Sequence, residues 1–321
     1  MKIGVFTVLL GNKPFEQALD YVKELGLEAV EIGCGAYPGD AHCKPVELLG
    51  SDKKLKAFKE AIRSRGLEIS ALSVHGNPIH PDKSIAKEHH EAFLRALKLA
   101  RKLEVDRVIT FSGCPGADPK ATSPAWIVSP WPPDFSEALE WQWKERVIPY
   151  WKEAAELARR EGIRKIALEM HPNFVVYNPE TLLKLREAVG PEIGCNFDPS
   201  HLFWQGADIA SAIRACGESI YHFHAKDCKL DRQNIAVNGV LDSKPYTKEI
   251  RRSWIFRTVG YGNDFAQWKD IVSNLRMVGY DHVLSIEHED SLMSAEEGLK
   301  KAVSFLKNVV ISEKPGEAYW A

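Results

Sequence analysis

A short pattern recurs along the chain: an amphipathic helix ends at a glycine, a few polar residues follow, and an apolar strand begins. The glycines of this unit are Gly26, Gly66, Gly162, Gly190 and Gly279. Glycine ends a helix at little cost because it can adopt the left-handed backbone conformation. The apolar runs that follow are typical of parallel strands buried on both faces. The pattern therefore predicts helices that alternate with parallel strands.

Eight such alternations can be read from the chain. Strands are predicted near residues 2–9, 28–33, 68–76, 106–112, 164–170, 192–198, 219–225 and 282–287. Helices are predicted near residues 14–25, 52–65, 83–103, 136–161, 179–189, 207–216, 264–278 and 295–310. Strict alternation favours a parallel sheet, and eight repeats predict an α/β fold, a single (β/α)8 TIM barrel domain over residues 1–321. A doubly wound open sheet is the alternative.

Two connections are long, after the fourth and the seventh predicted strands. Residues 113–135 are rich in proline, and residues 228–263 precede the eighth strand. In a barrel both would lie at the carboxyl ends of the strands, where active sites are found. We expect these loops to cover or select the substrate, and a surface insertion used for oligomer contacts is the alternative.

Charge and composition narrow the function classes. The net charge is −2 with no dense run of basic residues, which argues against a nucleic-acid partner. No apolar run approaches the ~20 residues of a membrane span, and the first residues lack the basic region of a signal peptide. No Gly-x-Gly-x-x-Gly or Walker-type loop follows a strand, so nucleotide folds lose support. Six irregularly spaced cysteines predict reduced thiols and a cytoplasmic location.

Acidic or imidazole side chains stand at the carboxyl ends of four consecutive predicted strands. They are Glu169, Asp198, His224 and Glu287. In a barrel these side chains would converge, and three carboxylates placed together would cost several kcal/mol without a cation. A set of three carboxylates and one imidazole suits Mn²⁺, Mg²⁺ or Co²⁺ better than a structural Zn²⁺. The pattern predicts one divalent metal ion; Mn²⁺ is favoured, and Mg²⁺, Co²⁺ or Zn²⁺ stay open.

The motifs around these residues resemble the xylose isomerase-like barrel superfamily, in its sugar phosphate isomerase/epimerase group. The resemblance is carried by ALEMHP around Glu169, by Asp-x-x-His from Asp198, by His-x-Lys-Asp from His224 and by Ser-Ile-Glu ending at Glu287. It covers nearly the whole chain. It implies that these four residues are the metal ligands and that His201 touches a substrate hydroxyl or the metal's surroundings.

The resemblance also implies a chemistry, that of ketose 3-epimerases and of inosose isomerases and dehydratases. Glu169 and Glu287 would act as the catalytic pair, one removing a proton beside a carbonyl and the other returning it, through a cis-enediolate held by the metal. The small-molecule substrate would be a sugar or keto-sugar. We expect a homo-oligomer, with a heteromeric partner also open.

Further substrate contacts are predicted from position along the strands. His171 has the same parity as Glu169, and His75 ends the third strand. Lys226 and Asp227 follow the metal histidine, and Arg257 in the seventh loop could reach over the site. Glu31, at the end of the second strand, is another position that resembles the family. For Arg257 the alternative is a solvated loop arginine, and for each of the others it is a hydrogen-bonded structural role in the barrel.

One departure from the family pattern leaves the reaction open. Ketose 3-epimerases usually carry an arginine six residues after the metal histidine, where this chain has Leu230. A metal-dependent dehydratase, or a lyase that cleaves keto-glycosides as C-glycoside deglycosidase subunits do, is therefore a rival. A non-catalytic sugar-binding barrel is the alternative from another class. The related apurinic endonucleases need further ligands that this chain lacks after His224, which argues against a nuclease.

Overall fold

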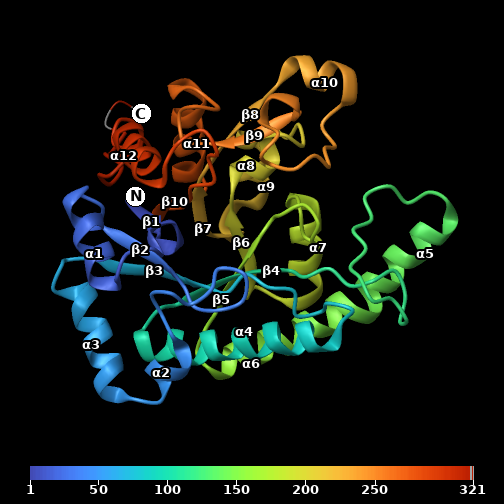
Figure 1. Ribbon diagram of the computed structural model, residues 1–321, viewed down its shortest axis with the longest axis horizontal. Helices are drawn as coiled ribbons and strands as arrows, with labels where there is room; N and C mark the ends of the chain where they lie inside the picture. Colours follow the sequence, from blue (N-terminus) through green and yellow to red (C-terminus); the bar gives the residue numbers. More distant parts are fainter. Residues whose placement is uncertain (319, 321) are drawn as a thin grey trace.

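The computed structural model describes residues 1–318 and 320, and its centre is a closed barrel of eight parallel strands (Figure 1). Around the barrel the strand order is β1-β10-β7-β6-β5-β4-β3-β2, so each strand pairs with its neighbours in sequence among the barrel strands. The strands are β1 Lys2–Phe6, β2 Ala29–Gly33, β3 Glu68–Ser73, β4 Arg107–Phe111, β5 Lys165–Glu169, β6 Ile193–Phe197, β7 Ile220–Ala225 and β10 Val283–Ile286. The TIM-barrel prediction is confirmed. The predicted domain also takes in residues 319 and 321, which lie outside the described residues.

Helices surround the barrel and bury the outer faces of its strands (Figure 1). They are α1 Phe15–Glu24, α2 Pro45–Leu49, α3 Asp52–Arg63, α4 Lys83–Leu103, α5 Pro133–Trp141, α6 Ile148–Arg160, α7 Pro179–Val189, α8 Pro199–Phe203, α9 Ile209–Cys216, α10 Arg232–Asn238, α11 Phe265–Met277 and α12 Ala295–Leu306. The glycines of the recurring unit all have positive φ, between 70° at Gly66 and 136° at Gly190. Their lack of a side chain therefore lets each helix stop and the chain turn toward the next strand.

The third predicted strand ends early, at Ser73, and the last predicted helix ends early, at Leu306, and two further elements differ in structure. The first strand ends at Phe6, and residues Thr7–Leu10 form a 3₁₀ helix instead of continuing the strand to residue 9. The single helix predicted at 136–161 is interrupted by a π-helical segment, Gln142–Val147, between α5 and α6. Pro149 lies at the start of α6 and has no N–H for the carbonyl group four residues earlier, which accounts for a wider turn at this point.

The loop after β7 is a small structured unit. Strands β8 Asp227–Leu230 and β9 Trp254–Arg257 pair antiparallel, with Asp227 opposite Arg257, and helix α10 and a 3₁₀ helix at Glu249–Arg251 lie between them. The proline-rich connection after β4 reaches α5 without forming a helix or a strand. Both long loops are thus present where the sequence predicted them. Within the described residues, no helix is long and apolar enough to cross a membrane.

Candidate metal centre and active site

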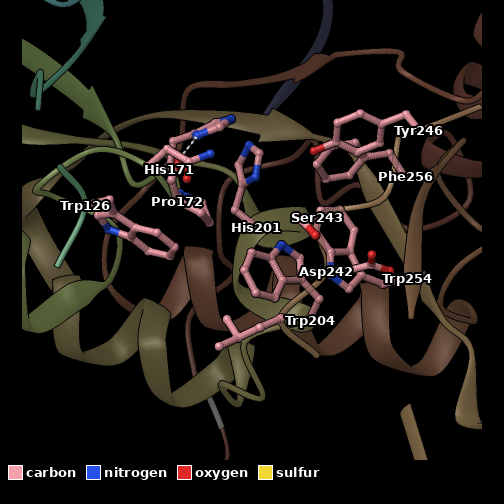
Figure 2. Close-up of a pocket in the computed structure, with 12 residues that line it drawn as sticks. Trp126, His171, Pro172, His201, Trp204, Asp242, Ser243, Tyr246, Trp254 and Phe256 are labelled. Atoms are coloured by element: carbon pink, nitrogen blue, oxygen red, sulfur yellow. Dashed lines mark hydrogen bonds between the residues drawn. The ribbon is translucent and has the colours of Figure 1, made fainter. Parts of the chain in front are cut away.

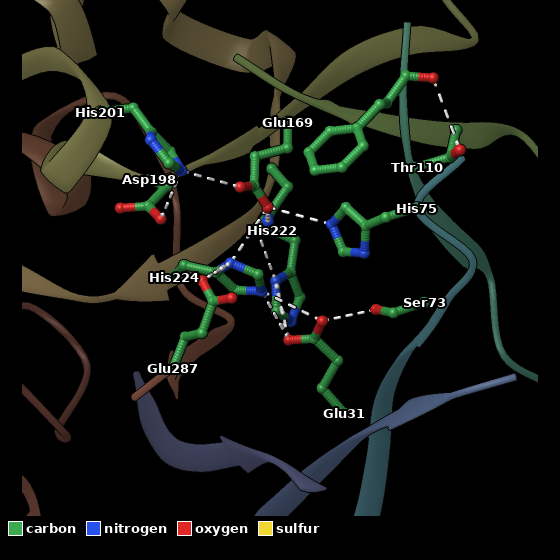
Figure 3. A network of polar contacts seen from close by, with 12 residues as sticks. Glu31, Ser73, His75, Thr110, Glu169, Asp198, His201, His222, His224 and Glu287 are labelled. Carbon is green, nitrogen blue, oxygen red and sulfur yellow. Dashed lines mark hydrogen bonds and ion pairs between the residues drawn. The ribbon is translucent and has the colours of Figure 1, made fainter. Parts of the chain in front are cut away.

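Donor atoms of Glu169, Asp198, His224 and Glu287 all lie within 4.8 Å of one another (Figure 3). Glu169 ends β5, Asp198 follows β6 as the N-cap of α8, His224 lies in β7 and Glu287 follows β10. Because these strands are neighbours in the barrel, their carboxyl ends bring the side chains to one point. Side chains of the first three are at most 3% exposed, and that of Glu287 is 19% exposed.

Two of these donor atoms are buried without a hydrogen-bond partner among the described residues: His224 Nδ1 and Asp198 Oδ2. His224 Nδ1 lies 3.0 Å from Glu287 Oε2 and 3.2 Å from Glu169 Oε2 but lacks hydrogen-bond geometry to either. Leaving such atoms unpaired costs about 1–3 kcal/mol each. A divalent cation among the four residues would satisfy both atoms and offset the repulsion between three carboxylates. The residues therefore fit a divalent metal ion.

The other ring nitrogen of His224, Nε2, is held by the carboxylate of Glu31. His224 Nε2 lies 3.0 and 2.9 Å from the two carboxylate oxygens of Glu31, which is fully buried in β2. Ser73 and Ser285 donate their hydroxyl protons to the same carboxylate. Burial opposes the charged form of His224, but Glu31 and Glu287 outweigh it and raise its pKa well above the usual value. Glu31 thus directs Nδ1 toward the other donors.

Glu169 is held as a carboxylate by several donors. Its Oε2 accepts from the amide of Asn196 at 2.9 Å and lies 3.0 Å from His75 Nε2, and its Oε1 lies 3.1 Å from His201 Nε2. Burial would raise the pKa of Glu169, yet the hydrogen bond from His201 and the positive charge of His224 hold it well below its usual range. This glutamate can therefore bind a cation or accept a proton while it stays fixed in position.

Lys226 supplies a positive charge beside the donors. Its ammonium lies 3.2 Å from Glu287, 3.5 Å from Asp198 and 2.6 Å from Glu289, and the side chain is 2% exposed. Burial lowers the pKa of Lys226, but the carboxylates, Glu287 foremost, raise it well above its usual value. Lys226 is therefore charged, and it lines a cavity of about 280 Å³ together with Glu169, Glu287 and His171.

His171 lies at the mouth of the site. Its ring centre is 4.1 Å from that of His201, and burial, with His201 adding to it, lowers the pKa of His171 to about 3. The imidazole is therefore neutral. The structure thus brings His75, His171, His201 and Lys226 to the four donor residues. Their predicted contacts with substrate stay predictions.

Asp227 and Arg257 make hydrogen bonds that stabilise the loop after β7. Asp227 accepts hydrogen bonds from the backbone N–H groups of Gly260 and Asn263 and from the indole of Trp268. Arg257 donates to Asp290 at 3.0 Å. The contacts of Asp227 fit the structural alternative, and Arg257 is paired with Asp290 rather than solvated. The predicted substrate contacts of both residues stay untested. Sequence reasoning missed Ser73, Asn196 and Ser285, whose signal was a polar residue inside a strand that is otherwise buried.

Comparisons with known proteins place this geometry in a family. Residues 19–309 match the model of the xylose isomerase-like TIM barrel. An uncharacterized protein, YfiH of Bacillus subtilis, is 40% identical over 312 residues, which cover 97% of this chain and 99% of that protein. The chain belongs to the xylose isomerase-like TIM barrel family.

Solved structures agree on the fold. A D-tagatose 3-epimerase-like protein superposes with a TM-score of 0.64 at 22% identity, covering 96% of this chain and 98% of the other. IolI, solved with a zinc atom bound, also has a TM-score of 0.64, at 19% identity, covering 97% and 98%. Sequence identities this low establish a shared barrel and leave the reaction to be argued from the site.

Proposed function

We propose that the chain is a divalent-metal-dependent sugar isomerase or epimerase that moves a proton on a carbon next to a carbonyl. The observation that carries this proposal is the approach of two glutamates, Glu169 and Glu287, to donor atoms of His224 and Asp198 that have no hydrogen bond among the described residues (Figure 3). A barrel that only bound sugar would need no such pair of bases beside a cation. Membership of the family agrees with a small sugar as substrate.

Glu169, Asp198, His224 and Glu287 would hold the metal ion. When bound, it supplies Lewis-acid polarisation of a carbonyl oxygen, which acidifies the neighbouring C–H group. Mn²⁺ is the favoured ion, with Mg²⁺, Co²⁺ and Zn²⁺ as alternatives.

Each glutamate has a defined part in the proton transfer. One carboxylate removes the proton from the carbon beside the carbonyl, and the electron pair of that C–H bond moves toward the carbonyl oxygen. The other returns a proton, to the opposite face of the same carbon in an epimerase or to the neighbouring carbon in an isomerase. Lys226, fixed beside Glu287, adds positive charge where the substrate gains negative charge. His75 and His201 keep Glu169 in position.

Deuterium exchange tests this proposal. The protein loaded with Mn²⁺ is incubated in D₂O with ketohexoses and inososes, and deuterium should enter one C–H position of a substrate. Glu287→Gln should lower that rate by about 10²–10⁴-fold, with metal content measured beside it because the variant also weakens the site. Glu137→Gln, on the exposed surface of α5, is the matched control. Turnover by protein stripped of metal would contradict the mechanism.

The same experiment separates the rival reactions. Loss of water or of an aglycone without deuterium entering the starting sugar would replace the isomerase with a dehydratase or lyase. Binding of sugar with neither result would indicate a sugar-binding barrel. The cytoplasmic location and the homo-oligomer, or a heteromer, stay predictions.

A further inference from the structure

An aromatic cavity of about 350 Å³ adjoins the metal-side cavity, and the proposed proton transfer makes no use of it (Figure 2). It lies under the loop that follows β7, with a wall from α8 and another from the long loop after β4. Its aromatic lining consists of Trp126, Trp204, Tyr246, Trp254 and Phe256. This volume is near the lower end of the ~300–1,000 Å³ usual for ligand pockets, enough for one ring.

The aromatic walls are held in place before any ligand binds. Trp204 and Trp254 stack with ring centres 4.7 Å apart and planes 5° apart. The buried guanidinium of Arg252 lies 4.3 Å from the Tyr246 ring centre and 4.6 Å from that of Trp254. Arg252 also donates to the backbone carbonyls of Lys244 and Trp254. Rings fixed in this way lose little freedom when a ligand stacks on them.

Two histidines lie between the aromatic cavity and the catalytic side chains. His201, which contacts Glu169, packs edge-on against Phe256 with ring centres 5.3 Å apart. His171 lines both the aromatic cavity and the metal-side cavity. A molecule whose one end lies beside Glu169 can therefore extend past His171 into the aromatic cavity.

The described lining of the cavity offers an anionic group no lysine or arginine. The charged residue among those that line it is Asp242, and Glu289 lines the cavity next to it. Asp242 is held by the ammonium of Lys244 at 2.8 Å and by the backbone N–H of Ser253, so its negative charge is fixed. Glu289 is likewise paired with Lys226 at 2.6 Å, so a phosphate here would find no lysine or arginine among the described lining residues. A neutral ring would instead find apolar faces and, at Trp204, a buried indole N–H with no partner among the described residues.

We propose that this cavity binds a neutral second ring, glycosyl or aryl, joined to the sugar that reacts. The preferred substrate is then a sugar with a ring substituent, rather than a free monosaccharide or a sugar phosphate. The inference rests on the proposed function for the reacting sugar only. Sugar rings and aromatic rings both present a flat apolar face to an indole, so the two sources share one recognition chemistry.

Calorimetric titration with compounds that need not react tests the inference. The probes are methyl β-D-glucopyranoside, phenyl β-D-glucopyranoside, cellobiose and glucose 6-phosphate, each added to the Mn²⁺-loaded protein. Phenyl glucoside or cellobiose should bind about tenfold more tightly than methyl glucoside. The tighter of the two identifies the source of the ring.

Substitutions locate the effect in the cavity. Tyr246 is 55% exposed, so Tyr246→Ala should fold, and it should reduce the two-ring preference severalfold. Trp204→Phe keeps an aromatic wall but removes the unpaired N–H, and should reduce the preference by a smaller factor. Tyr261→Ala is the matched control, because Tyr261 is 41% exposed and contacts Arg257 and Lys301 instead.

Equal affinities for the methyl compound and both two-ring compounds, including no measurable binding of any of them, would overturn the inference. Tightest binding of glucose 6-phosphate, or a preference that survives Tyr246→Ala, would also overturn it. Its failure is distinct from failure of the proposed function. If deuterium exchange occurs but two-ring compounds bind no more tightly, only the proposed role of the aromatic cavity is refuted. If two-ring compounds bind more tightly but no exchange occurs, only the proposed isomerase or epimerase reaction is refuted.

Discussion

At the scale of single residues, the two nitrogens of His224 have different surroundings. Nε2 faces the carboxylate of Glu31, and Nδ1 faces the donors of Glu169 and Glu287. A carboxylate behind a histidine fixes the orientation of the ring and raises its strength as a ligand. The direction of the ring is therefore set by a residue that lies behind it, away from the other donors.

Glu31→Gln tests this dependence. We expect metal affinity to fall about 10–100-fold, because the neutral amide holds the imidazole less firmly and cannot raise its basicity. The measurement is a competition titration with a chelator of known affinity. Glu28→Gln, three residues earlier and exposed, is the control and should keep the affinity of the unmodified protein. Unchanged affinity in Glu31→Gln would show that β7 alone positions His224.

The four donor residues could be predicted because each follows an apolar strand, and strand ends meet in a barrel. Behind them, Glu31 was found only as a position that resembles the family, and its contacts could not be predicted because its partners lie on strands distant in sequence. Ser285 and Glu31, for example, are 254 positions apart. The role of Asp227 could not be predicted for a different reason. Its partners are close in sequence but lie in a loop, and the spacing of apolar residues does not predict the course of a loop.

At the scale of elements, one buried carboxylate closes the β8–β9 hairpin onto the barrel. Asp227 Oδ2 lies 2.9 Å from the backbone nitrogen of Gly260, 3.0 Å from that of Asn263 and 3.2 Å from the indole nitrogen of Trp268 in α11. Gly262 approaches so closely that an added Cβ would lie 2.4 Å from the carbonyl oxygen of Cys228. The segment after β9 is therefore tied to the start of β8.

Asp227→Asn should destabilise this connection. The amide keeps the shape of the side chain but turns one acceptor into a donor that faces N–H groups, and hydrogen bonds to a charged group are worth about 1.5–3 kcal/mol each. We expect the free energy of unfolding, measured with urea, to fall by about 2–4 kcal/mol. Asp40→Asn, at an exposed site, should change it little. A fall of the same size in both variants would count against the role of Asp227.

The amino ends of β4 and β5 carry an ion cluster that depends on pH. Burial would raise the pKa of Asp106, but Arg107 at 2.6 Å and Lys165 at 2.5 Å lower it to about 2. Because the pKa is lower in the folded state, this contribution to stability is complete above about pH 4 and disappears as the pH falls toward 2.

Asp106→Asn should therefore be less stable than the unmodified protein at pH 6, and the difference should shrink between pH 4 and pH 3. The side chain is 55% exposed, so we expect a loss below about 1 kcal/mol at pH 6. Urea unfolding at several pH values measures it. A difference that is constant with pH would mean that packing, and not charge, is responsible.

Helices and strands were predicted well where apolar residues recur at a regular spacing. They were predicted less well where a proline interrupts a helix or a hairpin lies within a loop. Helix α4, Lys83–Leu103, agrees with its prediction because a long amphipathic run is capped by Asp82. The helix expected at 136–161 is interrupted because Pro149 has no backbone N–H to donate, and the spacing of apolar residues does not reveal this loss. The β8–β9 hairpin was hidden inside a segment assigned only as a loop.

At the scale of the whole molecule, closure of the barrel unites the site. Glu31 of β2 contacts His224 of β7, and His75, just after β3, contacts Glu169 of β5, both across the barrel. The three carboxylates of the donor set repel one another in the folded state unless a cation lies among them. Stability of the whole fold should therefore depend on the metal.

Removal of the metal should lower the melting temperature. A ligand that binds the folded state at about 100 times its dissociation constant adds about 2.7 kcal/mol, so chelation should cost several degrees in a chain of this size. Differential scanning calorimetry with chelator, then with Mn²⁺ restored, measures the change. The Asp198→Asn variant should melt at nearly the same temperature with and without Mn²⁺. An unmodified protein indifferent to chelator would argue against a metal in this site.

Asp227 ties the start of the β8–β9 unit to the segment after β9 and to α11. This anchoring has a consequence for how such proteins diversify. Three of the five aromatic lining residues, Tyr246, Trp254 and Phe256, belong to this insertion, whereas the proposed ligands stand on the ends of the barrel strands. An insertion that carries its own anchor can be lengthened, shortened or exchanged between relatives without disturbing the donors beneath it. Descendants of one barrel could thus acquire new substrates by replacing about thirty contiguous residues and inherit the chemistry unchanged.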